Sequence, residues 1–122
     1  MAGERRRAAA AIATARDVAG GEGAMDVPPQ CALITGWAWD PRRPDVAVEV
    51  EIHAGADRLA TVPAYWYRPD LAAAGIGNGR HAWLYPTPPR LKDGQPRVIR
   101  ARVSGADREL AGSPTPFVCA VR

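Results

Sequence analysis

The sequence has few of the residues on which most catalytic and metal sites depend. It contains two serines, two histidines, two cysteines and one lysine among 122 residues. Ser104 and Ser113 stand in Gly- or Pro-containing turns without a nucleophile-elbow motif, which argues against acyl-transfer catalysis. His53 and His81 have no Cys or carboxylate companions at metal-ligand spacings. We therefore expect no enzyme activity, no catalytic residues, no metal and no cofactor.

Long apolar runs are also missing, so no membrane span is expected, since a spanning helix needs about 20 apolar residues. Residues 1–15 resemble a signal peptide only superficially, because the apolar stretch is short and runs into Arg16-Asp17. The net charge is only +3, and acidic and basic residues alternate along the chain. Because a nucleic-acid binder usually gathers its positive charge on one face, we expect no nucleic-acid partner.

Glycine and proline are abundant, with 12 of each, and they separate short apolar runs. This pattern predicts an all-β fold, a β-sandwich of about seven strands, and the length suits one domain. We expect the sandwich over residues 25–122 and an Ala/Arg-rich arm over residues 1–24. Three interpretations of the arm stay open: a flexible segment, a helix that docks on a partner or a second copy, and a start assigned too early. Under either of the first two, the arm would mediate self-assembly or binding to a protein partner.

The strongest strand signal lies in Gln30 to Asp40, which is apolar on both faces and should be mostly buried. Val46, Val48, Val50 and Ile52 then alternate with polar residues, which predicts a core face and a wet face that carries Glu49, Glu51 and His53. Further strands are expected over residues 58–66, 81–86, 97–103, 108–111 and 115–121. In this scheme Trp37, Trp66 and Trp83 belong to the core.

Residues 68–75 predict a single helical turn that ends at Gly75. Gly75, Gly77 and Gly79 are spaced at every second position, which is not the spacing of a phosphate-binding loop. They predict a tight loop of left-handed residues instead.

These motifs together resemble a known module. They are Gly36-Trp37-Ala38-Trp39-Asp40-Pro41, Arg68-Pro69-Asp70-Leu71-Ala72, Gly75-Ile76-Gly77 with Gly79 and His81, the Asp93-Gly94 hairpin, and Leu110 with Gly112-Ser113-Pro114. The order and spacing over residues 30–116 are similar to a small bacterial immunoglobulin-like or fibronectin-like β-sandwich module of proteobacterial surface, glycosyltransferase-associated and phage-like proteins. The resemblance implies a spacer, an adhesive unit or a sugar-contacting accessory, and it implies no catalytic residue.

One group of residues is a candidate binding surface for a glycan. The aromatic rings of Tyr65 and Tyr67 would stack on sugars or proline-rich partners, and nearby polar side chains would give directional hydrogen bonds. The predicted ligand-binding set is Tyr65, Tyr67, Arg68, Asp70, Asn78 and His81. The alternative is that these aromatics are ordinary interface residues.

Cys31 and Cys119 fall in the first and last predicted strands, which are neighbours in many sandwiches. A disulfide between them would imply an oxidising compartment, whereas the alternative is two small buried hydrophobic residues.

Three functions follow from this sequence. The first is a non-catalytic module displayed on a bacterial cell surface or virion-like particle for adhesion or glycan contact. The second is a structural decoration or oligomerisation subunit of a larger assembly without a ligand of its own. The third is an accessory domain of a glycan-processing system.

Overall fold

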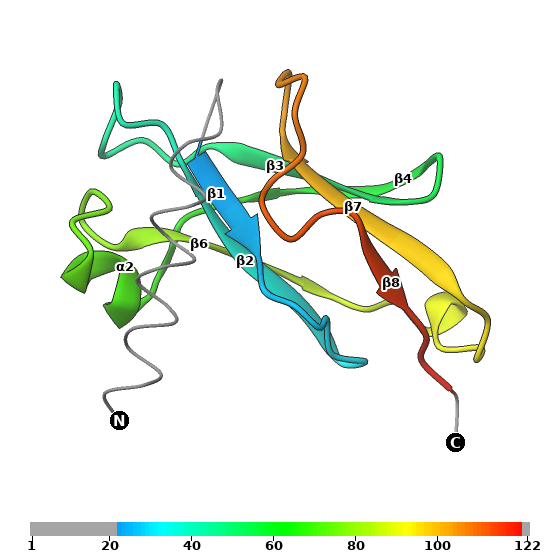
Figure 1. Cartoon of the computed structure of the whole chain (residues 1–122). Coiled ribbons are helices and arrows are strands. Elements are labelled where there is room, and N and C mark those ends of the chain that lie inside the picture. Colours follow the sequence, from blue (N-terminus) through cyan, green and yellow to red (C-terminus); the bar gives the residue numbers. More distant parts are fainter. Residues whose placement is uncertain (1–21, 121–122) are drawn as a thin grey trace.

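The computed structural model describes residues 22–120, which form two antiparallel four-stranded sheets (Figure 1). The first sheet has the order β1 (Glu22–Met25), β2 (Leu33–Trp39), β6 (Arg80–Pro86), β5 (Trp66–Tyr67). The second has the order β4 (Asp57–Pro63), β3 (Glu49–Ala54), β7 (Arg97–Val103), β8 (Thr115–Phe117). Helical segments are α2 (Pro69–Ala73) and the 3-10 turn η1 (Pro89–Leu91). The predicted all-β, sandwich-like architecture is confirmed.

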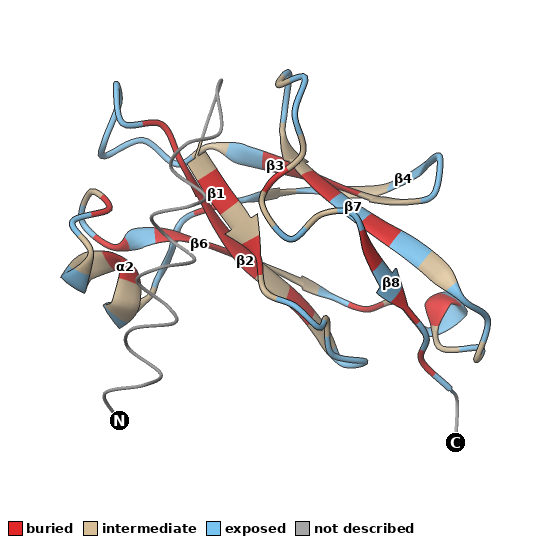
Figure 2. Ribbon diagram, in the orientation of Figure 1, coloured by how far each residue is buried: buried red, intermediate tan, exposed pale blue. Residues whose placement is uncertain are grey.

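The main core lies between the two sheets and takes residues from both. It includes Ile34, Ala38 and Trp83 from the first sheet and Val50, Ile52, Ile99, Ala101 and Phe117 from the second (Figure 2). The alternation predicted for β3 therefore has the right phase at Val50 and Ile52. Val46, which the same pattern placed in the core, is 47% exposed because β3 begins only at Glu49.

The first sheet also has an apolar outer face. Trp37 and Trp39 alternate with Gly36 and Ala38 along β2, so their indoles lie on the side away from the main core. There they pack with Leu71 of α2 and Ile76 of the following loop. This second cluster explains why both faces of β2 are apolar, and it confirms that the strand is mostly buried.

Two strands differ from the sequence prediction. β1 was not expected, because Gly23 and Ala24 have low β-propensity, and the strand is defined by its pairing with β2. It spans position 24, where we placed the end of the arm, while residues 1–21 of the arm lie outside the described residues. The predicted strand 58–66 stops at Pro63, and the chain crosses to the first sheet, where β5 begins.

The C-terminal strands are shorter than predicted. Residues 108–111 form only an isolated bridge, between Ala111 and Ala24, rather than a strand. The last described strand, β8, ends at Phe117, whereas the prediction extended it to residue 121.

The predicted helical turn and glycine loop are present. α2 ends as Ile76 N donates to Leu71 O at 2.9 Å, and Gly75, with φ of 76°, supplies the left-handed exit. Gly77 cannot be replaced easily, because a Cβ there would lie 2.6 Å from Nε2 of His81.

A disulfide joins Cys31 to Cys119, with 5.4 Å between the Cα atoms. The cysteines lie just before β2 and just after β8 rather than inside strands, so the bond links the two sheets. Over residues 22–120 no helix is long and apolar enough to cross a membrane.

Candidate functional site

Three consecutive aromatic residues are exposed along one margin of the first sheet. Tyr65 and Trp66 are each 47% exposed and Tyr67 is 53% exposed. Among the described residues, β5 is the outermost strand of its sheet and pairs only with β6. We call Tyr65, Trp66 and Tyr67 the aromatic edge. The other three tryptophans are at most 5% exposed, so the exposure of Trp66 is exceptional in this chain.

The rings of the aromatic edge are held in place by their neighbours. The Tyr65 and Trp66 rings lie 4.9 Å apart between centroids with an interplanar angle of 39°. Tyr67 lies against Gly79, where an added Cβ would come within 3.0 Å of the tyrosine Cε1 atom. The absence of a side chain at Gly79 therefore lets the Tyr67 ring rest on the glycine loop.

Arg68, the next residue, is fixed by two carboxylates. Its Nε and Nη2 atoms donate to Asp70 at 3.0 and 2.7 Å, and Nη1 donates to Asp26 Oδ2 at 3.0 Å. Burial opposes ionisation of Asp70, but hydrogen bonds from Arg68 outweigh it and keep the pKa of Asp70 below its usual value. Arg68 and Asp70, both predicted to bind ligand, thus bind each other and anchor the aromatic edge to the sandwich.

The two remaining predicted residues lie in different surroundings. Asn78 is exposed; its Oδ1 accepts from Arg80 N at 2.9 Å, and its side-chain amide donates to none of the described residues. His81 is 1% exposed, with its ring centroid 6.1 Å from that of Trp39. This corrects the prediction that His81 belongs to the exposed surface: its ring points into the space closed by Trp39 and Gly77.

Burial favours the neutral form of His81. Within the described part of the chain neither ring nitrogen makes a hydrogen bond of good geometry. Loss of hydration therefore lowers the pKa of His81. The ring packs against Trp39 and Gly77.

Trp66 is the functional candidate that the sequence analysis missed. It is in phase with Ala60, Val62 and Ala64, so the alternation placed it in the core. Pro63 was the available signal, because proline interrupts strand pairing and allows the chain to change sheets.

Ser104, Glu51 and His53 form a second polar cluster, on the outer face of the second sheet. Their hydrogen bonds do not connect them in the order that a catalytic triad requires. Ser104 Oγ donates to Glu51 Oε2 at 2.8 Å, and His53 Nε2 lies 3.2 Å from Glu51 Oε1. In a catalytic triad the histidine stands between serine and acid, whereas here Glu51 stands between the other two. Hydrogen bonds from Ser104 and then His53 lower the pKa of Glu51. These partners cover Glu51, which is only 8% exposed, whereas the sequence predicted a solvent-exposed side chain.

No group of three His, Cys, Asp or Glu side chains within residues 22–120 is arranged to hold a metal ion. Comparisons with protein-family models, curated proteins and solved structures give no match to this chain. We therefore infer function from the geometry of the aromatic edge.

Proposed function

We propose that this protein is a non-catalytic, immunoglobulin-like or fibronectin-like binding module that contacts a glycan through its aromatic edge. The observation that carries the proposal is the exposure of Tyr65, Trp66 and Tyr67 in a chain that buries its other tryptophans. Grouped exposed aromatics mark interaction sites, since their apolar faces remain in contact with water until a partner covers them. The C–H faces of sugar rings suit aromatic faces of this kind.

The chain path supports the immunoglobulin-like assignment. Successive strand pairs alternate between the sheets: β1 and β2 in the first, β3 and β4 in the second, β5 and β6 in the first, β7 and β8 in the second. The central pairs, β2 with β6 and β3 with β7, join strands distant in sequence. Such crossings are a property of sandwiches of this class.

The polar surroundings supply what glycan hydroxyl groups require. Tyr65 and Tyr67 are exposed and carry hydroxyl groups, and Asn78, which precedes Gly79 in the loop that Tyr67 contacts, is also exposed. Because Arg68 is held by Asp26 and Asp70, the aromatic edge is ordered before a ligand arrives. Preorganisation of this kind reduces the entropy lost on binding.

Display on a bacterial cell or particle surface is the setting that we propose. The disulfide between Cys31 and Cys119 supports it, since such bonds persist mainly in oxidising compartments. The arm would then anchor the module, and an accessory role beside a glycan-processing enzyme would use the same aromatic surface.

The proposal is tested by screening the full chain on a glycan array and measuring affinities for the hits by calorimetry. Trp66→Ala and Tyr67→Ala should each weaken binding at least tenfold, about 1.4 kcal/mol or more. Val118→Ala is the matched control, because Val118 is 59% exposed on another segment. Binding that survives both aromatic substitutions, or a folded chain that binds no glycan, would contradict the proposal.

A second candidate function is self-association in a structural assembly. It is favoured by the outer side of β5, with which no strand within residues 22–120 pairs, because an unpaired sheet edge can pair with another chain. Light scattering on the full chain and its Trp66→Ala variant distinguishes the two: an oligomer that dissociates in the variant favours assembly, and a monomer in both favours glycan binding.

A further inference from the structure

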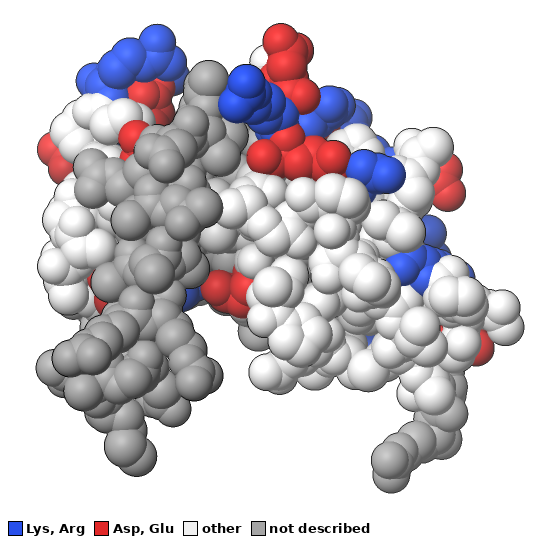
Figure 3. Space-filling view, viewed as in Figure 1, with Lys and Arg blue, Asp and Glu red and all other residues white. Residues whose placement is uncertain are grey.

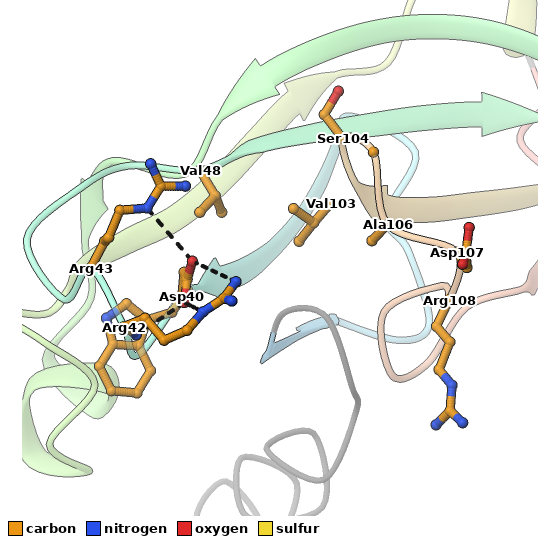
Figure 4. A pocket seen from close by; sticks show the side chains of 11 residues that line it. Asp40, Arg42, Arg43, Val48, Val103, Ser104, Ala106, Asp107 and Arg108 are labelled. Atoms are coloured by element: carbon orange, nitrogen blue, oxygen red, sulfur yellow. Dashed lines mark hydrogen bonds and ion pairs between the residues drawn. The ribbon is translucent and has the colours of Figure 1, made fainter.

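A pocket lies at one end of the sandwich, apart from the aromatic edge. It has a volume of about 420 Å³ and lies between the β2–β3 connection and the β7–β8 connection (Figure 4). Charged side chains gather at this end, at the top of the view in Figure 3. The volume is in the range of small-ligand sites.

The floor of this pocket is aliphatic. Val48, Val103 and Ala106 line it, and Figure 4 shows the two valine side chains directed into the gap between the connections. Trp39 also lines the pocket, but it is only 5% exposed and offers little ring face. The Ser104 hydroxyl is engaged by Glu51. The floor therefore suits an apolar side chain better than a sugar ring.

Arginines dominate the wall formed by the β2–β3 connection. Asp40 Oδ1 accepts from Arg42 Nε at 3.1 Å and from its backbone N at 3.0 Å, and Oδ2 accepts from Nη2 at 3.3 Å. Asp40 is thereby neutralised and Arg42 is oriented. Nη1 of Arg42 bonds to none of the described residues, and Arg43 reaches Asp40 only through Nε, at 3.7 Å.

The opposite wall carries one charge of each sign, Asp107 and Arg108. Neither forms an ion pair within residues 22–120. The pocket as a whole has three arginines and two aspartates, so it carries one surplus positive charge. Guanidinium groups with unused N–H donors bind carboxylates strongly.

Both connections are ordered by their own backbone bonds. Arg43 N donates to Asp40 O at 3.0 Å, Val46 N to Arg43 O at 3.1 Å, and Ala106 N to Val103 O at 2.9 Å. The walls are therefore shaped before a ligand arrives, which favours binding.

We propose that this pocket binds an acidic peptide segment of a protein partner, with an aliphatic side chain on the floor and a neighbouring carboxylate on Arg42 and Arg43. The inference goes beyond the proposed glycan contact and does not depend on it, because the two sites share no residue. An acidic glycan would satisfy the arginines but leave the aliphatic floor uncovered.

The test is a titration of the isotope-labelled full chain, followed by amide NMR, with a hexapeptide of alternating glutamate and valine. We expect saturable shifts at Arg42, Gly105 and Ala106, weakened by salt since the contact is electrostatic. Arg43→Glu should lower the affinity at least fivefold, and Ala106→Glu should do the same. Arg90→Glu, an exposed charge reversal in η1, is the control and should leave affinity within twofold.

Two further peptides test separately whether the carboxylates and the aliphatic side chains are needed for binding. A glutamine–valine hexapeptide and a glutamate–serine hexapeptide should each bind at least fivefold more weakly than the glutamate–valine peptide. The proposal is overturned if the glutamate–valine peptide shifts none of the three amides at millimolar concentration, or if either control peptide binds equally well. Tighter binding by a uronic-acid oligosaccharide at the same amides would also overturn it. Each of these results leaves the proposed glycan contact, which is tested by Trp66→Ala, unaffected.

Discussion

The indole of Trp83 lies directly over Gly36, its cross-strand partner on β2. A Cβ at position 36 would meet the backbone oxygen of Ala24 on β1 and would lie 2.6 Å from Trp83 Cε2, so the glycine makes room for both the neighbouring strand and the indole. Gly36→Ala should lower the free energy of unfolding by about 3 kcal/mol, because overpacking displaces the β1 backbone and the indole. Urea denaturation measures this.

Gly55→Ala is the matched control for this prediction. Gly55 has φ of 59° and open space around it, so only backbone strain of about 1 kcal/mol is expected. Equal losses at positions 36 and 55 would show that the close packing of Ala24 and Trp83 around Gly36 does not contribute to stability.

Buried His81 should make the fold sensitive to mild acid. Its pKa in the folded chain lies below the unfolded value of about 6.5, so the unfolded chain takes up the proton first. Stability should therefore fall as the pH drops below about 6.5, with a slope of at most about 1.4 kcal/mol per pH unit. The loss of stability ends near the pKa of His81 in the folded chain. The nearby Pro44 carbonyl and then Asp45 partly offset the effect of burial on the pKa of His81.

His81→Phe removes the titrating group while keeping a ring beside Trp39. Urea denaturation between pH 7.5 and 5 should give a flatter profile for this variant than for the parent chain. An unchanged profile would assign the pH dependence to other groups.

The Arg68 pairs should stabilise the fold modestly. Arg68→Lys loses the two-point contact with Asp70, and we expect a loss of about 1 kcal/mol because the partners are partly exposed. Arg80→Lys is the control: Arg80 is exposed on the neighbouring strand, and its change should stay within about 0.5 kcal/mol. A larger loss at position 80 than at 68 would contradict the anchoring role of Arg68.

Removing the disulfide should lower stability more than the Arg68 substitution does. The bond joins two residues separated by 88 positions in the sequence. The double variant Cys31→Ala, Cys119→Ala should therefore lower the free energy of unfolding by about 2–4 kcal/mol. A thiol assay on the denatured, unreduced chain should detect no free thiol. Two free thiols, with equal stability before and after reduction, would exclude the bond.

The parts of the fold that follow from local periodicity were predictable. β7 has the predicted bounds, and Val50 and Ile52 of β3 face inward as expected, because alternation of apolar residues states which side is buried. β1 and β5 were not predictable in this way. They have four and two residues, too few for periodicity, and they exist because β2 and β6 offer free edges.

In the candidate site, too, only some features could be predicted from the sequence. Tyr65 and Tyr67 were selected as exposed aromatics, and they are exposed, but Trp66 was placed in the core because the change of sheets after Pro63 has no signature in alternation. His81 and Arg68 are polar, which favours a surface position. Only the tertiary structure shows that the first is covered by packing and the second is bound by Asp26 and Asp70.

The most direct test of the aromatic edge is the fluorescence of Trp66 during ligand titration. Among the four tryptophans it alone is exposed, so a glycan that covers it should change the emission of the full chain. With the strongest glycan from the array, we predict a saturable emission change whose midpoint matches calorimetry and which disappears in Trp66→Phe. A glycan that binds by calorimetry while the emission stays constant would contradict the proposed site.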